Sequence, residues 1–310
     1  MELQIREYQN DDKTYLKQIV LAVFGDRDLR NHAYFGEACI TPTQAKTLVA
    51  VVAGNPVGFT SFYQNPLHYH PHDFRVSIVV APEFQHKGIG HKLHEALLNA
   101  LPCSIARMRT ITLEQTSAEL FLKALNYKPL LRSFAPKLTV QAVDLSAYLH
   151  ILTALEVSGY CFRTLAELDI AQRYELVELC MSAYADIHTY SPPIPSQKWA
   201  SIFLGKDCIN EAFFVAIKDK SLVGFSSLQL GEREGEMESM WDGVARSERA
   251  LEFPLRLALK LKEVEYAMKN GVCNLNWEVD SVDLFGMRLL EELPFTLPPA
   301  YQIWVREVYR

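Results

Sequence analysis

The loop Gln85-His86-Lys87-Gly88-Ile89-Gly90 has a composition suited to holding an anion. Glycine lets the backbone bend and approach a ligand without a Cβ clash. If the loop opens a helix, the first turn supplies backbone N–H groups without partners and a dipole that favours negative charge. A diphosphate would accept several of these amide hydrogen bonds, and Lys87 would add charge. Glycines also occur in strand-to-helix turns for packing alone, so the loop by itself leaves both interpretations open.

The residues around this loop predict a strand before it and a helix after it. Residues 76–80 (VSIVV) are rich in β-branched side chains, which favour strands. Pro82 ends that strand, because proline cannot continue a central ladder. The helix has apolar positions that step by four, four and three residues along one face: Ile89, Leu93, Leu97 and Ala100.

This arrangement resembles the acetyl-coenzyme A motif of the GNAT N-acetyltransferase family. The family pattern is Gln/Arg-x-x-Gly-x-Gly/Ala between a valine-ended strand and a helix, usually with a proline after the strand. Val80, Pro82, Gln85, Gly88 and Gly90 match it, and the agreement of spacing, strand and helix makes the match specific. The loop is unlike a dinucleotide-binding loop, because Gly-x-Gly-x-x-Gly and a later acidic ribose partner are absent.

The resemblance implies an acyltransferase that takes acetyl-coenzyme A as co-substrate in the N-terminal half of the chain. The pantetheine arm would pair with the end of the strand like an extra strand, and a backbone N–H near Val80 would stabilise the oxyanion. The diphosphate would lie on residues 85–90. The implied cofactor-binding residues are Ile78, Val79, Val80, Gln85, His86, Lys87, Gly88, Ile89, Gly90, Gln115 and Phe121.

A second family pattern, Asn-x-x-Ala-x-x-Phe-Tyr, is matched only in part after the strand predicted at residues 105–113. Ala118 and Phe121 agree with it, whereas Gln115 replaces the asparagine and Leu122 replaces the tyrosine. In the family that tyrosine is the usual proton donor to the departing thiolate. Leucine cannot donate, so another group or water must do so, or this domain transfers slowly or not at all.

The general base and acid are therefore the least defined part of the predicted site. A thioester is already activated, so the enzyme must align a neutral amine, polarise the carbonyl and manage two protons. Glu114 is the nearest acidic candidate and would act through water, although a glutamate at a strand end is more often simply solvated. Ser117 is an alternative proton donor.

The composition is that of a soluble globular protein with 310 residues and a formal net charge of -6. We expect two domains, no membrane span and no signal peptide. Six scattered cysteines without a C-x-x-C pair indicate free thiols in a reducing cytoplasm. The mild acidity argues against nucleic acid and is compatible with a cationic acceptor, which we expect to be an amine of a small molecule or peptide. Whether the chain forms a homodimer is left open.

A histidine-rich loop is the one sequence feature that suggests a metal. His68, His70 and His72 alternate, and on an extended segment they would share a face. Pro66 and Pro71 favour an irregular loop instead, and no further ligand is evident nearby. We therefore expect solvated histidines and no metal.

The second half of the chain repeats the first at an offset of about 160 residues. VGFSSL at residues 223–228 corresponds to VGFTSF at residues 57–62. We expect an α/β (α+β) fold of two tandem GNAT-like domains, each with a mixed, mostly antiparallel sheet flanked by helices. The predicted boundaries are a first domain at 1–142, a linker at 143–160 and a second domain at 161–310. A final strand pair of the first domain is expected at 130–140.

The second copy of the loop is degenerate. Gly243, Val244 and Arg249 match the loop expected in tandem GNAT proteins. The two glycine positions of that loop can be aligned in two ways. In both alignments Glu252 stands at one glycine position, and Ala250 or Pro254 stands at the other. A Cβ hinders the approach of a diphosphate, and a glutamate repels it. We do not expect this half to bind coenzyme A. Aromatic and acidic residues there would shape an acceptor pocket or belong to an ordinary core: Tyr184, His188, Tyr190, Trp199, Trp241, Asp242, Asn276, Trp277, Glu278 and Asp280.

Three functions compete on this evidence. The first is an N-acetyltransferase that works from the first domain. The second, supported by Leu122, is a non-catalytic protein that binds or senses acetyl-coenzyme A. The third is a scaffold or dimerisation protein whose glycine loop is structural. Coenzyme A binding separates the third from the other two, and thiol release in the presence of amines separates the first from the second.

Overall fold

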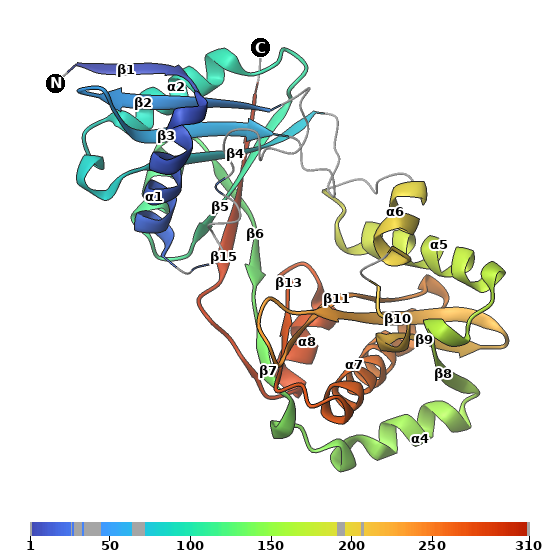
Figure 1. Cartoon of the computed structure of the whole chain (residues 1–310). Coiled ribbons are helices and arrows are strands. Elements are labelled where there is room, and N and C mark those ends of the chain that lie inside the picture. Colours follow the sequence, from blue (N-terminus) through green and yellow to red (C-terminus); the bar gives the residue numbers. More distant parts are fainter. Residues whose placement is uncertain are drawn as a thin grey trace. The chain divides into compact units, whose positions relative to one another are not determined.

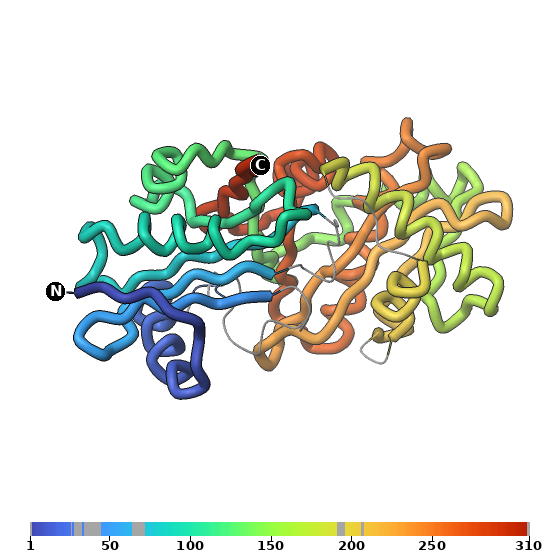
Figure 2. The backbone as a smooth tube through the Cα atoms, turned by 90° about the horizontal axis from the view of Figure 1, so that it is seen from above, coloured from blue at the N-terminus to red at the C-terminus, as the bar shows by residue number. Residues whose placement is uncertain are grey.

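A computed structural model describes residues 2–25, 27, 33, 45–63, 72–190, 196–205 and 208–308. Their backbone is drawn in Figures 1 and 2. The chain divides into two compact units. Unit 1 contains Met1–Leu130 together with Tyr301–Arg310, and unit 2 contains Leu131–Ala300.

Unit 1 is built on a mixed sheet in which the last strand of the chain takes part. Its neighbours are antiparallel except for β4 and β5, which are parallel. The strand order is β1 (Leu3–Glu7), β2 (Lys46–Val52), β3 (Asn55–Tyr63), β4 (Asp73–Val80), β5 (Arg107–Leu113) and β15 (Tyr301–Glu307).

Helices α1 (Lys13–Phe24) and α2 (Ile89–Ala100) cover opposite faces of this sheet (Figure 2). Alternate strand residues point to opposite sides, so each helix packs on a different set of strand side chains. The α1 side holds the cluster Leu16, Ile19, Val20, Val49, Val51, Phe59 and Val79. The α2 side holds the cluster Ala50, Val52, Val57, Ile89 and Leu93. Helix α3 (Ser117–Ala124) follows β5, and Asn126 stands just beyond its end in the left-handed conformation (φ 61°), which asparagine tolerates.

The parallel pairing of β4 and β5 is short. It joins residues 73–75 to residues 107–109 and then stops, although β4 continues to pair with β3 and β5 with β15. The Asp73 carboxylate spans the paired end, where it accepts hydrogen bonds from Arg107 Nε at 2.9 Å and Arg109 Nη2 at 3.0 Å. Beyond this clamp the two strands part, and among the described residues no strand pairs with the facing backbone edge of either one.

The strand pair expected at residues 130–140 forms differently from the prediction. Two strands occur there, β6 (Lys128–Phe134) and β7 (Lys137–Thr139), but β7 pairs with β12 (Asn274–Trp277) and β14 (Phe295–Thr296) of unit 2. In exchange, β15 pairs with β5 of unit 1 over seven residues. The predicted boundaries at 142 and 161 follow the repeat in chain order and stay a prediction. The contacts instead group Leu131–Ala300 as one unit and join Tyr301–Arg310 to the N-terminal unit.

Unit 2 has a second mixed sheet with the same plan. Strands β11 and β12 pair in parallel, and β13 (Val279–Asp280) pairs with β6. The strand order is β14, β7, β12, β11 (Glu236–Val244), β10 (Ser221–Leu230), β9 (Phe213–Lys218) and β8 (Tyr160–Thr164). The helices of this unit are α4 (Leu149–Val157), α5 (Ile170–Ile187), α6 (Ser196–Phe203), α7 (Glu252–Lys269) and α8 (Leu284–Glu292).

The expected fold class is confirmed, with two mostly antiparallel sheets that helices flank (Figure 1). The segment predicted as a linker contributes to the core of unit 2, since α4 buries Leu155 in a cluster with Tyr160, Phe214 and Leu255. Among the helices that the structure describes, none is long and apolar enough to cross a membrane.

The exchange of strands predicts that the C-terminal end of the chain stabilises unit 1. Trp304 of β15 is only 1% exposed and packs in a cluster with Leu97, Met108 and Leu122. We expect Trp304→Ala to lower the free energy of unfolding by about 3–5 kcal/mol in urea titrations. Leu297→Ala, at a side chain that is 52% exposed, is the control and should change it little. Equal effects of the two substitutions would contradict this role.

Candidate functional site

A cavity of about 680 Å³ lies in unit 1 where β4 and β5 part. Residues 76–80 of β4 and 110–113 of β5 form its sides. Gly88, Gly90 and His91 line it at the start of α2, and Phe24 lines it at the end of α1. Since α1 and α2 cover opposite faces of the sheet, the cavity reaches from one face to the other through the gap between the strands.

The glycine loop enters α2 in an open conformation. Gly88 is the N-cap of the helix with φ 79°, a left-handed conformation that favours glycine. A Cβ at this residue would meet no atom within 4 Å, so open space adjoins the loop. Gln85 ties the loop to the end of β4, because its Nε2 donates to the Val80 carbonyl at 2.9 Å. The loop is thus held in place while the unpaired amides of the first helical turn stay available to an anion.

Gly90 is required for a different reason. A Cβ at residue 90 would lie 3.1 Å from Cζ of Phe121 on α3, closer than ordinary contact. The same Phe121 ring meets the His91 imidazole edge to face, with 5.2 Å between ring centroids. Phe121 therefore packs against Gly90 and His91 at the start of α2, and it also lines the cavity.

The structure brings most of the predicted cofactor residues together around the cavity. Ile78, Val79, Val80, Gln85, His86, Gly88, Gly90 and Phe121 line it. Three do not. Lys87 donates from Nζ to the Glu83 carbonyl at 2.7 Å, Ile89 is buried in the core, and Gln115 forms a turn whose backbone N–H bonds Glu119. Binding roles for all of these residues stay predictions.

The two predicted catalytic residues differ in position. Ser117 lines the cavity at the start of α3, whereas Glu114 is not among the lining residues. Leu122 lines the cavity and is 5% exposed, so an apolar side chain stands where the family has its tyrosine. None of the described lining residues carries a carboxylate. A carboxylate base is therefore absent from the described part of the wall, where the imidazoles of His86 and His91 are side chains that can accept a proton.

Sequence reasoning missed Thr110, Thr112, His91 and Tyr127, which also line the cavity. The Tyr127 hydroxyl lies 3.5 Å from Nε2 of His94, and that nitrogen also accepts from Arg306 at 3.1 Å. Burial, and the nearby charges of Arg306 and His91, lower the pKa of His94 to about 4, so the imidazole is neutral at pH 7. Burial raises the pKa of Tyr127. No local pattern signals this group, because its members come from distant segments.

The structure describes only part of the histidine-rich loop, for which no metal was expected. His68 and His70 lie outside the described residues, and Nδ1 of His72 lies 2.9 Å from the Ser104 carbonyl oxygen. In the part of the chain that the structure describes, no three metal-ligating side chains gather. Cys39 also lies outside that part, and the five cysteines within it are free thiols.

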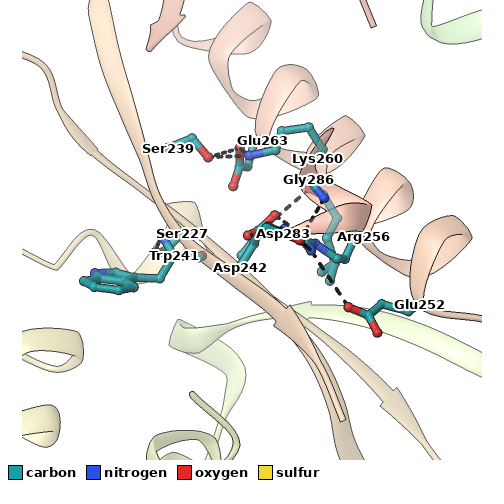
Figure 3. A network of polar contacts seen from close by, with 12 residues as sticks. Ser227, Ser239, Trp241, Asp242, Glu252, Arg256, Lys260, Glu263, Asp283 and Gly286 are labelled. Carbon is teal, nitrogen blue, oxygen red and sulfur yellow. Dashed lines mark hydrogen bonds and ion pairs between the residues drawn. The ribbon is translucent and has the colours of Figure 1, made fainter. Parts of the chain in front are cut away.

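Unit 2 repeats the parted strands but fills the gap with its own charges. Strands β11 and β12 are parallel over residues 236–239 and 274–277 and then part. Arg256 of α7 is 1% exposed and bonds both oxygens of Asp283 at 2.6 Å and Asp242 Oδ1 at 2.9 Å (Figure 3). Burial alone would raise the pKa of Asp283, but Arg256 holds it below its usual value.

The start of α7 also carries an internal anion. Glu252 is its first residue and is 5% exposed, with Oε2 3.1 Å from Nη1 of Arg249. The helix end that is open glycine in unit 1 is therefore occupied by a carboxylate in unit 2. Further along the helix, Lys260 bonds Ser239 and lies 2.8 Å from Glu263, and all three side chains are buried in the core.

The aromatic residues proposed for an acceptor pocket belong largely to the core of unit 2. Tyr184, Trp199 and Trp241 pack against one another with ring centroids 4.9–5.7 Å apart. Asn276 donates to Glu236 and Glu238, so it too has partners within the unit. A role in an acceptor pocket stays a prediction for these residues.

We expect Arg256→Met to destabilise unit 2 strongly. Removing the guanidinium leaves the buried carboxylates of Asp242 and Asp283 without their cation, which typically costs about 3–5 kcal/mol. Lys262→Met is the matched control, since that ion pair on the same helix is exposed and should contribute about 1 kcal/mol or less. Urea unfolding followed by circular dichroism measures both. A similar small loss in both variants would show that the buried network is dispensable.

Comparisons with known proteins agree with this geometry. Residues 43–129 match the family model described as an acetyltransferase (GNAT) domain. A GCN5-related N-acetyltransferase from Sphaerobacter thermophilus is similar over 99% of this chain and 96% of its own, with 18% identity and a TM-score of 0.65. A tandem GNAT protein from the clavulanic acid biosynthesis pathway is 17% identical over 100% of this chain and 99% of its own, with a TM-score of 0.63. The comparison with curated proteins found no match.

Proposed function

The chain has the tandem GNAT fold, with a GNAT acetyltransferase domain in its N-terminal part, and from this premise we propose that unit 1 transfers an acetyl group from acetyl-coenzyme A to an amine. The acceptor is an amine of a small molecule or peptide, attacked directly without a covalent enzyme intermediate. The observation that carries the proposal is the open left-handed Gly88 at the start of α2, next to a cavity between parted strands.

The cavity fits a long, narrow ligand with an anionic end. Open space at Gly88 leaves room for a diphosphate on the first amides of α2, which favour negative charge. Beyond residue 75, every second amide of β4 faces the side where β5 no longer pairs, so an amide-bearing arm can pair there as a strand would. An amide of the same edge would bind the thioester oxygen and stabilise the negative charge that attack creates.

The acceptor would approach from the α1 side, because the diphosphate site occupies the α2 side. Val23, Phe24 and Arg27 line the cavity there. Apolar walls exclude water and hold the amine against the carbonyl, which supplies the main catalytic gain in a reaction whose acyl group is already activated. Ser117 remains a candidate proton donor at the wall, and Glu114 remains a candidate base that would need water to reach the amine.

A matched pair of glycine variants tests cofactor binding in unit 1. Gly88 and Gly54 share φ 79°, and at both a Cβ would have no atom within 4 Å, but Gly54 lies in the β2–β3 turn away from the cavity. Glutamate at either residue costs a similar backbone strain, roughly 1–2 kcal/mol. In wild type and Gly54→Glu, saturating acetyl-coenzyme A should raise the melting temperature by several degrees. Gly88→Glu should lose that rise.

Two results would contradict this assignment. If acetyl-coenzyme A fails to raise the melting temperature of wild type, the acetyltransferase function is wrong and a scaffold role is favoured. If Gly88→Glu keeps the full rise, the cofactor binds elsewhere in the chain.

We further propose that one chain binds a single coenzyme A. In unit 2 the equivalent helix start holds Glu252, and Arg256 bonds the carboxylates of Asp242 and Asp283. Isothermal titration calorimetry should therefore give a stoichiometry near one acetyl-coenzyme A per chain, and the Arg256→Met variant should not raise it. A stoichiometry near two would mean that unit 2 also binds the cofactor.

A non-catalytic role in binding or sensing acetyl-coenzyme A is the second candidate. It is favoured by Leu122, which lines the cavity in place of a proton donor, and by the lack of a carboxylate among the described lining residues. Thiol release from acetyl-coenzyme A with a panel of primary amines decides between the two functions. Binding without thiol release above the uncatalysed rate would favour the sensing role.

A further inference from the structure

A buried hydroxyl on β5 offers what Leu122 lacks. We propose that Thr112 donates a hydrogen bond to the departing sulfur of the thioester, and that Trp304, from the C-terminal strand, positions and strengthens this donor. The inference rests on the proposed acetyl transfer and assigns it a group that neither the sequence motif nor the fold identifies.

The hydroxyl of Thr112 can still donate a hydrogen bond to a group in the cavity. Thr112 lines the cavity and is 8% exposed, and its Oγ1 accepts a hydrogen bond of 2.9 Å from the indole Nε1 of Trp304. A threonine hydroxyl has one proton and two lone pairs, and an indole can only donate. The bond to Trp304 therefore uses a lone pair and leaves the hydroxyl proton. Among the described residues, no acceptor takes that proton, so a ligand in the cavity is its available partner.

The strand pairing explains why the indole reaches this hydroxyl. Trp304 lies opposite Thr110 in the β15–β5 register, so Thr112 is its diagonal neighbour on the same face. Met108, Thr110 and Thr112 share that face because side chains alternate along a strand. Met108 and Trp304 pack in one cluster with Leu122 of α3. Thr112 and Leu122 thus border the cavity from the same side of the sheet.

The other hydroxyls of the wall are less suited to this role. Thr116 Oγ1 donates to the Leu113 carbonyl at 2.8 Å, so its proton is already used. Ser77 Oγ shares a hydrogen bond of 2.7 Å with Ser61 Oγ. Thr110 is only partly buried, and Ser117 is exposed. Thr112 combines burial, a fixed orientation and a donor bonded to its oxygen.

The step balances without a proton leaving Thr112. Attack by the amine forms the C–N bond, and the C–S bond then breaks with its electron pair passing to sulfur. Thr112 donates a hydrogen bond to that sulfur as it becomes negative, while the proton on nitrogen passes to water and the thiolate is protonated by solvent. An alcohol is a far weaker acid than a thiol, so the hydroxyl keeps its proton. The indole N–H draws density from Oγ1 and strengthens the O–H donor, as in other hydrogen-bond chains.

Thr112→Val tests this role, because valine keeps the branched shape and removes only the hydroxyl. Thiol release from acetyl-coenzyme A is followed in the full chain, with hydroxylamine as a small nucleophile and the uncatalysed rate subtracted. We expect kcat to fall about 10–100-fold, somewhat less than the loss of an oxyanion donor typically gives. The acetyl-coenzyme A thermal shift should stay that of wild type, because the hydrogen bond forms with the sulfur only as charge develops.

Three further variants separate catalysis from structure. Thr112→Ser keeps the hydroxyl and should retain kcat within about threefold. Thr60→Val removes a buried threonine hydroxyl of β3 that is not among the lining residues, so it is the matched control and should leave kcat unchanged. Trp304→Phe removes the indole N–H but keeps a ring, so kcat should fall less than in Thr112→Val with no change in the KM for acetyl-coenzyme A.

Rescue provides the sharpest test. Leu122→Tyr restores the hydroxyl that the family motif has, and in the Thr112→Val background it should recover at least part of the lost kcat. Recovery in this double variant supports a donor to sulfur, because a packing defect at residue 112 would not be repaired from α3.

The outcomes distinguish this inference from the function on which it rests. Wild-type kcat in Thr112→Val, or an equal loss in Thr60→Val, overturns the role of Thr112 and leaves acetyl transfer standing. Failure of Leu122→Tyr to recover any activity, in a double variant that keeps the wild-type thermal shift, also overturns it. Absence of thiol release by wild type overturns the proposed function, and this inference with it.

Discussion

The Asp73 carboxylate bonds Arg107 and Arg109 across the short stretch where β4 and β5 run together. Charge-assisted hydrogen bonds of this kind are stronger than neutral ones, and here they hold together the paired ends of β4 and β5. The ladder stops after three residue pairs, while the outer neighbours β3 and β15 continue to pair. The cavity, its free backbone edge and the loop at the end of β4 all follow from this local stop in the ladder. A sheet with full pairing here would be more stable as a sheet and would have no site.

The two units apply the same plan with opposite results. Both contain a parallel pair that parts after a few residues. In unit 1 the gap is bordered by aliphatic side chains, hydroxyls and glycine, so an anionic, amide-rich ligand can supply the missing contacts. In unit 2 Arg256 already bonds two carboxylates, and Glu252 sits at the helix start. The carboxylates outnumber the cations in this group, so an anionic ligand would be repelled there.

Local chemistry accounts for what could be predicted from the sequence. The VSIVV run, the left-handed Gly88 and the apolar spacing of α2 act over a few residues, so their types and order specify the strand, loop and helix. The repeat of VGFTSF as VGFSSL likewise specified two similar sheets. The cavity wall on the loop side was predicted for the same reason. Only Lys87, Ile89 and Gln115 of that set turned away from it, because nearby backbone and core contacts engage them.

The parts that could not be predicted depend on contacts between distant residues. The Thr112–Trp304 hydrogen bond joins residues 192 apart, and Arg256 reaches Asp283 across 27. Neither pair has a spacing that any helix or strand period would indicate. The exchange of β7 and β15 was missed for a related reason. The sequence predicted β7 only as part of a final strand pair of the first domain and did not predict β15, and only the tertiary structure decides which sheet a strand joins. Pairing partners of a strand are set by the whole fold.

The exchange of β15 also affects the order in which the protein can be made. Synthesis proceeds from the N-terminus, and domains usually fold as they emerge from the ribosome. Here the open edge of β5 must wait until residues 301–307, the last strand of the chain, have left the exit tunnel. Until then unit 1 presents an unpaired strand edge beside an incomplete core, the kind of surface that chaperones bind and that promotes aggregation. Unit 2, whose strands lie within residues 131–300, has no such wait. The unit that carries the candidate site is thus completed after unit 2.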